Sequence, residues 1–152
     1  FVCEDNRWSA TTPTGTMTAG AGALARAVAI GVPGEQVDGN DVFAVDAVSS
    51  RLIQNLRNGS GPRFLHAVTY RFKGHVSVDA ASYRNPEEVK RALEGDPLLL
   101  AAARISSSEA KQIVEEAESE VRAALKAAAE APRPAVEEAY RDIQDTGAGQ
   151  WR

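Results

Sequence analysis

The chain has 152 residues, of which 43% are hydrophobic and 25% charged, a composition typical of a soluble domain that can bury a core. The net charge of -4 disfavours a nucleic-acid-binding protein, because such proteins are usually basic. The single cysteine excludes an internal disulfide, and no apolar run is long enough to span a membrane. We therefore expect a cytoplasmic protein without nucleic-acid or membrane partners.

Strands and helices are predicted to alternate along the first 70 residues. In chain order we expect a buried strand at Phe1–Cys3, a loop at 9–18, a helix at Ala19–Ile30, a strand at Glu35–Val37, a helix from Asn40 or Asp41 to about Leu56, and a strand at Phe64–Tyr70. Such alternation indicates an α/β fold with a parallel sheet and crossover helices, a portion of a doubly wound sheet.

Polar residues follow each of the three predicted strands. In a parallel sheet, ligands bind at the carboxyl ends of the strands. Asn6, Asp38 and His75 each come after a predicted strand, so we expect all three at this edge of the sheet.

The remaining residues are predicted to be helical. Asn85-Pro86 and Asp96-Pro97 are typical helix starts, with a capping side chain followed by proline in the first turn. A long helix from Ser106 to about Ala131 and a short helix at Ala135–Asp142 follow. We divide the chain into an α/β domain at 1–84 and a helical region at 85–152.

Asn6 and His75 are the candidate functional side chains. The amide oxygen of Asn6 could bind Mg²⁺, although an asparagine after a strand more often caps a turn. His75 could transfer protons near neutral pH, although a lone histidine in a polar loop is more often a surface residue. We expect Cys3 to pack in the core, His66 to be a satisfied or edge histidine within its strand, and Asp38-Gly39-Asn40-Asp41 to form a strand end, a turn and a helix cap.

Three motifs, considered together with their order and spacing, resemble one enzyme family, the alpha subunit of the thiamine diphosphate-dependent 2-oxo acid dehydrogenases. They are Glu4-Asp5-Asn6-Arg7-Trp8, Val37-Asp38-Gly39-Asn40-Asp41-Val42, and Tyr70-Arg71-Phe72-Lys73-Gly74-His75 with Asp79 and Tyr83-Arg84. This resemblance implies that residues 1–84 are the C-terminal portion of a thiamine diphosphate-binding domain, and that 85–152 are helices packed on it.

The resemblance also implies a role for each candidate. The Asn6 side chain and the Trp8 carbonyl match the positions that bind Mg²⁺, which in turn holds the cofactor diphosphate. Asp5 stands where the family has another asparagine, and the family's third ligand, from a Gly-Asp-Gly segment, is not in this chain. His75 matches a histidine that lies near the diphosphate and takes part in reductive acylation. Val76 stands where animal pyruvate dehydrogenases carry a phosphorylated serine.

The implied activity is oxidative decarboxylation of a 2-oxo acid, or cleavage of acetoin, with transfer of the acyl group to a lipoyl domain of the acyltransferase component. The implied assembly is a heterotetramer with beta subunits. The apolar start at Phe1 predicts that an N-terminal half of the subunit precedes this sequence. Two alternatives remain: a non-catalytic interaction module that uses the long helix, and another Mg²⁺-dependent thiamine diphosphate enzyme, such as a transketolase or a carboxy-lyase.

Overall fold

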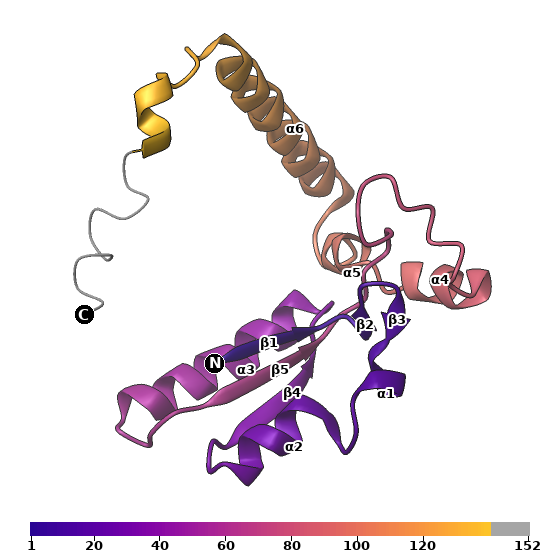
Figure 1. The fold of residues 1–152 in the computed structure, drawn as a ribbon, viewed down its shortest axis with the longest axis vertical. Helices are drawn as coiled ribbons and strands as arrows, with labels where there is room; N and C mark the ends of the chain where they lie inside the picture. Colours follow the sequence, from indigo (N-terminus) through magenta and orange to yellow (C-terminus); the bar gives the residue numbers. More distant parts are fainter. Residues whose placement is uncertain (141–152) are drawn as a thin grey trace. The chain divides into compact units, whose positions relative to one another are not determined.

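The computed structural model describes residues 1–140, in two compact units: one spans Phe1–Ser106 and the other begins at Ser107 (Figure 1). The first unit contains β1 (Val2–Asp5), β2 (Trp8–Ser9), β3 (Thr12–Pro13), α1 (Thr14–Met17), α2 (Gly22–Ala29), β4 (Gly34–Asp38), α3 (Val42–Arg57), β5 (Phe64–Val68), α4 (Pro86–Leu93) and α5 (Pro97–Ala102). The second unit contains α6 (Ser107–Glu130) and the 3-10 helix η1 (Val136–Tyr140).

The main sheet has three parallel strands in the order β1-β5-β4. Asp5 of β1 and Asp38 of β4 both lie opposite Val68 of β5, so the three strands end together at one edge. This arrangement confirms the predicted α/β class and the parallel sheet.

Helices cover both faces of this sheet. Leu65 of β5 belongs to a buried cluster with Leu52 of α3, whereas the neighbouring Phe64 lines a cavity together with Ala27 of α2. Successive side chains of a strand point to opposite faces, so α2 and α3 lie on opposite sides of the sheet. This is the arrangement of a doubly wound fold.

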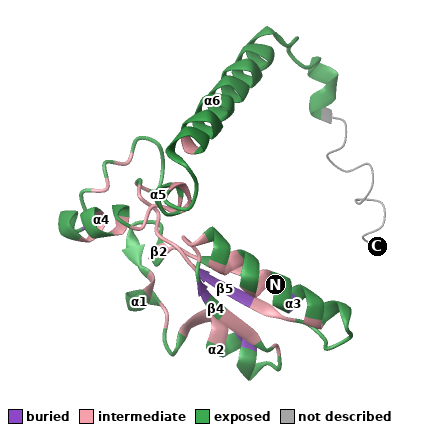
Figure 2. Ribbon diagram, turned by 180° about the vertical axis from the view of Figure 1, so that it is seen from behind, coloured by how far each residue is buried: buried purple, intermediate pink, exposed green. Residues whose placement is uncertain are grey.

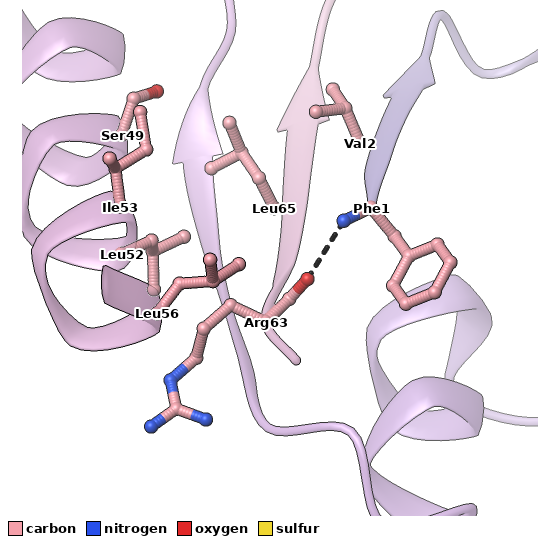
Figure 3. A pocket seen from close by; sticks show the side chains of 8 residues that line it. All are labelled: Phe1, Val2, Ser49, Leu52, Ile53, Leu56, Arg63 and Leu65. Carbon is pink, nitrogen blue, oxygen red and sulfur yellow. Dashed lines mark hydrogen bonds between the residues drawn. The ribbon is translucent and has the colours of Figure 1, made fainter. Parts of the chain in front are cut away.

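The first strand is less buried than the sequence predicted. Phe1 is 78% exposed and Val2 68% exposed, and the buried residues are concentrated on β4 and β5 (Figure 2). The reason is that α2 and α3 pack mainly against β4 and β5, whereas β1 contacts chiefly its neighbour β5. A cavity of about 140 Å³ opens beside it, lined mainly by apolar side chains of β1, β5 and α3 (Figure 3).

Several predicted boundaries differ from the structure, including the strands predicted at Phe1–Cys3 and Phe64–Tyr70, which span Val2–Asp5 and Phe64–Val68. The predicted loop at 9–18 instead contains the two-stranded β2–β3 hairpin and the one-turn helix α1. The helix predicted from Ala19 begins at Gly22, because Gly20 adopts a positive φ of 81°, which lies outside helical geometry. The predicted end at Gly31 is confirmed, with a φ of 86°.

The helix starts in the C-terminal region are confirmed. The Asn85 side chain accepts a hydrogen bond from the Glu87 amide at 2.9 Å, and Asp96 accepts one from the Leu98 amide at 2.8 Å. The last two residues of the short helix predicted at Ala135–Asp142 lie outside the described residues. None of the helices within residues 1–140 combines the length and the apolar character of a membrane span. A domain boundary at residue 84 remains a prediction, and α4 and α5 group with the sheet in the first compact unit.

Candidate functional site

Two segments leave the carboxyl edge of the sheet from neighbouring strands. We call residues 6–8, which follow β1, the Asn6 arm, and residues 70–84, which follow β5, the His75 loop. The Thr69 amide donates to the Asp5 carbonyl at 2.9 Å, so the two segments start side by side. Gly39 follows β4 at the same edge, where its amide donates to the Val68 carbonyl at 2.7 Å.

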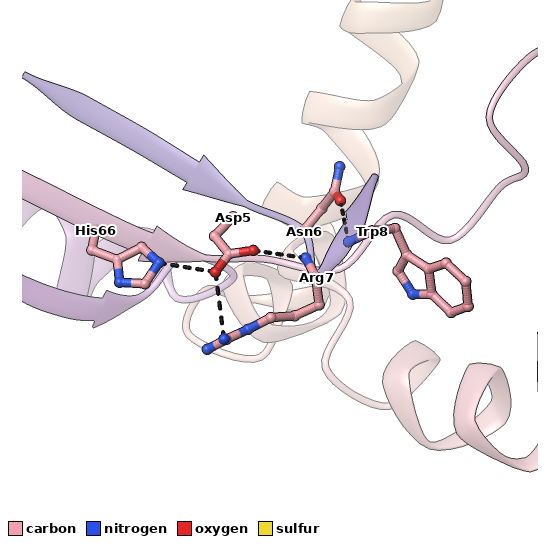
Figure 4. A network of polar contacts seen from close by, with 5 residues as sticks. All are labelled: Asp5, Asn6, Arg7, Trp8 and His66. Carbon is pink, nitrogen blue, oxygen red and sulfur yellow. Dashed lines mark hydrogen bonds and ion pairs between the residues drawn. The ribbon is translucent and has the colours of Figure 1, made fainter. Parts of the chain in front are cut away.

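The Asn6 arm is a tight turn held by the side chains of Asp5 and Asn6 (Figure 4). The carboxylate of Asp5 accepts from the Arg7 amide, and the amide oxygen of Asn6 accepts from the Trp8 amide, both at 2.9 Å. Arg7 has a φ of 65°, which is uncommon for a residue with a side chain. The turn-capping reading of Asn6 is therefore correct, and its oxygen keeps a second lone pair for a ligand.

The Asp5 carboxylate is engaged with the sheet. Its second oxygen lies 3.0 Å from Nε2 of His66, a β5 side chain that is only 3% exposed, and 3.4 Å from the Arg7 guanidinium. Burial raises the pKa of Asp5, but the hydrogen bonds from the Arg7 amide and from His66 outweigh burial, so the pKa lies below its usual value. In Figure 4 the carboxylate points toward His66, whereas the Asn6 amide points away from it. Asp5 therefore acts as a structural anion.

A cavity of about 540 Å³ lies beside the Asn6 arm. Its walls come from the end of β1, from the arm itself, and from the segment between α1 and the first turn of α2. Asn6, Arg7 and Trp8 all line it, so the arm faces a space that can hold a ligand.

The His75 loop is organised around Asp79. Its carboxylate accepts hydrogen bonds from the His75 amide at 2.6 Å, the Tyr83 hydroxyl at 2.7 Å and the Ala81 amide at 2.8 Å. The Tyr83 hydroxyl, followed by the two amides, lowers the pKa of Asp79 to about 2. A Cβ atom on Gly74 would lie 2.3 Å from the Asp79 carbonyl oxygen, so only glycine fits beside this carboxylate.

The His75 ring has a defined tautomer. Nη1 of Arg71 lies 3.2 Å from its Nδ1, and a guanidinium can only donate hydrogen bonds. A neutral His75 ring therefore carries its proton on Nε2, which is the nitrogen available to a ligand. His75 lines a cavity of about 410 Å³ formed by its own loop, separate from the cavity beside Asn6.

Arginine side chains join the two segments. Nη2 of Arg71 donates to the Ala10 carbonyl, just beyond the Asn6 arm, at 2.6 Å. The Arg84 guanidinium lies 4.8 Å from the centre of the Trp8 ring and 5.2 Å from that of Tyr70. Asn6 and His75 are therefore carried by linked segments at the predicted edge. The sequence motifs included both arginines but indicated none of these contacts.

The other residues considered from the sequence have structural roles. Asp38 accepts from the Asn40 amide at 2.9 Å, and Asp41 caps α3 by accepting from the Phe43 amide at 3.0 Å. Burial, followed by the nearby Asp5 charge, raises the pKa of Cys3, so it is not an activated thiol. These observations agree with the structural roles expected for Cys3 and for Asp38-Gly39-Asn40-Asp41.

The oxygen donors of the Asn6 arm fit a magnesium ion that is held mainly by a bound anion. Within residues 1–140, no three His, Cys, Asp or Glu side chains converge to form a metal site. The Asn6 oxygen and the Trp8 carbonyl are hard oxygen donors of the kind that Mg²⁺ binds, but both are neutral. Besides the buried Arg84, three cationic side chains, Arg7, Arg71 and Lys73, belong to the arm and the loop and are at least partly exposed, so this edge suits a bound diphosphate better than a bare cation.

Comparison with known proteins identifies relatives across nearly the whole sequence. A family model described as dehydrogenase E1 component matches residues 1–137. The pyruvate dehydrogenase E1 component subunit alpha of Rhizobium meliloti (strain 1021) is 36% identical over 150 residues, which cover 94% of this chain and 43% of the relative. The 2-oxoisovalerate dehydrogenase subunit alpha of Bacillus subtilis (strain 168) is 36% identical over 100 residues, or 65% of this chain and 30% of the relative. The chain thus spans less than half the length of these curated relatives.

Proposed function

Because the chain belongs to the dehydrogenase E1 component family, we propose that it is part of the alpha subunit of a thiamine diphosphate-dependent 2-oxo acid dehydrogenase. The whole enzyme would decarboxylate a 2-oxo acid oxidatively, or cleave acetoin, and transfer the acyl group to a lipoyl domain. The observation that best supports this function is the linked pair of segments, the Asn6 arm and the His75 loop, at the carboxyl edge of one parallel sheet.

In this proposal the Asn6 arm holds Mg²⁺. The Asn6 side chain and the Trp8 carbonyl supply two of the six oxygens that octahedral Mg²⁺ requires, and the cofactor diphosphate supplies others. The turn in which Asn6 accepts from the Trp8 amide keeps both donors in one rigid segment. When bound, thiamine diphosphate supplies the carbanion chemistry, and the protein positions it.

His75 has the second role, next to the diphosphate. With Arg71 opposite Nδ1, the neutral ring presents Nε2–H as a hydrogen-bond donor toward an anionic group or a developing negative charge. The Asp79 network fixes the backbone at His75, because its carboxylate binds the His75 amide directly. His75 would therefore serve both in cofactor binding and in the acyl transfer that follows decarboxylation.

The proposed partners are a beta subunit, a lipoyl domain of the acyltransferase component and the rest of the alpha subunit. Exposed apolar side chains on β1 and at the C-terminal end of α2 support coverage by other protein surfaces: Val2 is 68%, Val28 55% and the C-cap residue Ile30 80% exposed. Large exposed apolar patches mark interfaces.

The experiment that tests the proposal replaces Asn6 by alanine in the full-length alpha subunit assembled with its beta subunit. We expect Asn6→Ala to abolish Mg²⁺-dependent binding of thiamine diphosphate, measured by calorimetry, because it removes both a metal ligand and the cap of the turn. Asn58→Ala is the matched control, since Asn58 is an exposed residue at the C-terminus of α3, away from the carboxyl edge of the sheet. Normal cofactor binding and activity of the Asn6→Ala enzyme would refute the assigned site.

A further inference from the structure

Arg84 is a buried cation without a carboxylate partner among the contacts of residues 1–140. It is 5% exposed, and its Nε and Nη2 atoms are buried without a hydrogen-bond acceptor. Burial of an unpaired charge is costly, so other contacts of the Arg84 side chain must offset this cost.

The contacts of Arg84 come from both segments of the candidate site. The guanidinium lies 4.8 Å from the Trp8 ring centre and 5.2 Å from the Tyr70 ring centre, and Nη1 donates to the Arg71 carbonyl. Both distances are within the range of cation–π attraction. A planar guanidinium can stack on one ring with each face, which an ammonium group cannot do. Arg84 therefore fastens the Asn6 arm to the first residues of the His75 loop.

The Asn6 arm needs such a restraint. Arg7 occupies the left-handed region at a φ of 65°, a conformation that persists only where the surroundings enforce it. The Trp8 amide is fixed by Asn6, and the Trp8 ring is fixed by Arg84 and by Tyr83, whose ring centre is 5.6 Å away. With the amide and the ring both held, the Cα atom of Trp8 is fixed, and the pairing of Trp8 with Pro13 in the β2–β3 hairpin keeps its carbonyl in an extended conformation.

We infer that Arg84 is a positioning residue for the Trp8 carbonyl, acting through the Trp8 ring on the magnesium site of the Asn6 arm. The inference rests on the proposed function, and it gives Arg84 a role distinct from that of any metal ligand. At Trp8 only the backbone carbonyl would touch the metal. The inference nevertheless implies that removing the Trp8 ring lowers the affinity for Mg²⁺ as much as removing the Arg84 side chain.

The test measures Mg²⁺ affinity by calorimetry in the presence of thiamine diphosphate, using the full-length alpha subunit assembled with its beta subunit. For Arg84→Gln we expect the Kd of Mg²⁺ to rise about 10- to 100-fold, the usual effect of losing a group that orients a metal ligand. Arg84→Lys should give an intermediate rise, because it keeps the charge but loses the planar stack. Arg104→Gln is the matched control: Arg104 lies 4.7 Å from the centre of the Phe43 ring and 3.4 Å from the Asp41 carboxylate, so its contacts are at the start of α3 rather than with the Asn6 arm, and the Kd should not change.

Two further variants separate positioning from a general loss of structure. Trp8→Leu keeps the backbone carbonyl and removes the ring, so we expect it to raise the Kd as Arg84→Gln does, while Trp8→Phe keeps a ring and most of the affinity. The double variant Arg84→Gln with Trp8→Leu should lose no more than either single variant, because both remove one shared interaction.

A second readout needs no cofactor. In the cofactor-free enzyme, hydrogen exchange of peptides covering residues 6–13 should be faster in Arg84→Gln than in the unmodified protein, and unchanged in Arg104→Gln. If the unmodified enzyme binds the cofactor with Mg²⁺, but Arg84→Gln shows the same Kd and the same exchange, the inference is overturned and the proposed function stands. If the unmodified enzyme shows no Mg²⁺-dependent cofactor binding, the proposed function is wrong and the inference is wrong with it.

Discussion

At the scale of single residues, Asp79 determines the shape of the His75 loop through three hydrogen bonds to one carboxylate. Its pKa is lowered from 3.8 to about 2, chiefly by the Tyr83 hydroxyl and then by the His75 and Ala81 amides. A carboxyl whose folded-state pKa is depressed stabilises the loop fully above its unfolded-state pKa and loses this contribution as the pH falls through the folded-state value. The loop should therefore keep its structure at pH 4 and lose it only near pH 2.

This pH dependence can be measured by following the Asp79 carboxyl carbon and the Ala81 amide by NMR from pH 5 to pH 1.5. We expect both signals to titrate together with a midpoint near 2. A midpoint near 4 would mean that the Asp79 network does not form in solution. We also expect residues 72–84 to be mobile without cofactor, and hydrogen exchange of this segment would test it.

The sequence identified the candidate residues from local motifs but gave no information on their long-range partners. Asn6 and Trp8 follow β1 directly, so their place at the carboxyl edge followed from the strand prediction alone. The contact between Asp5 and His66 joins residues 61 positions apart, and it depends on which strands are neighbours and in what register. Arg84 stacks on Trp8 from the far end of a loop, and no local periodicity predicts such a contact.

At the scale of elements, α3 illustrates a helix whose start is specified by one side chain. Asp41 accepts hydrogen bonds from the Phe43 amide at 3.0 Å and the Ala44 amide at 3.2 Å, which would otherwise lack partners in the first turn. We expect Asp41→Ala to lower the free energy of unfolding by about 1 kcal/mol. Urea denaturation followed by circular dichroism would measure this, with Asp46→Ala as a control at an exposed position within α3. Equal stability of the two variants would contradict the capping role.

Helices were predicted more accurately than the short strands, for a physical reason. The limits of α3 follow from apolar residues repeating every three or four positions and from the Asp41 cap, both of which are local. The β2–β3 hairpin has only two residue pairs and lies in a segment of small polar residues, so it carries no alternating pattern. Burial of β1 was overestimated because apolar composition shows that a strand can be buried, whereas the helices that pack on the sheet decide whether it is.

At the scale of the whole molecule, this chain has little core for its length. Within residues 1–140, the buried hydrophobic side chains are Ala27, Val37, Leu52, Leu65 and Ala67. Apolar side chains on α6, including Ile113, Val114, Val121 and Leu125, are between 55% and 65% exposed. Both compact units thus present surfaces of the kind that protein neighbours cover, as expected for part of a larger assembly.

The last prediction concerns the 152-residue chain on its own. The metal donors available on the Asn6 arm are the Asn6 amide oxygen and the Trp8 carbonyl, both neutral, because the Asp5 carboxylate is engaged by His66 and Arg7. Mg²⁺ needs six oxygens and is held in proteins largely by negative charge, so two neutral donors cannot compete with water for the metal. We therefore expect the isolated chain neither to bind thiamine diphosphate tightly nor to decarboxylate a 2-oxo acid. Calorimetry with Mg²⁺ and the cofactor is the measurement, and both properties should return when the remainder of a full-length alpha subunit and a beta subunit are supplied. Micromolar binding to the isolated chain would show that these residues alone form the site.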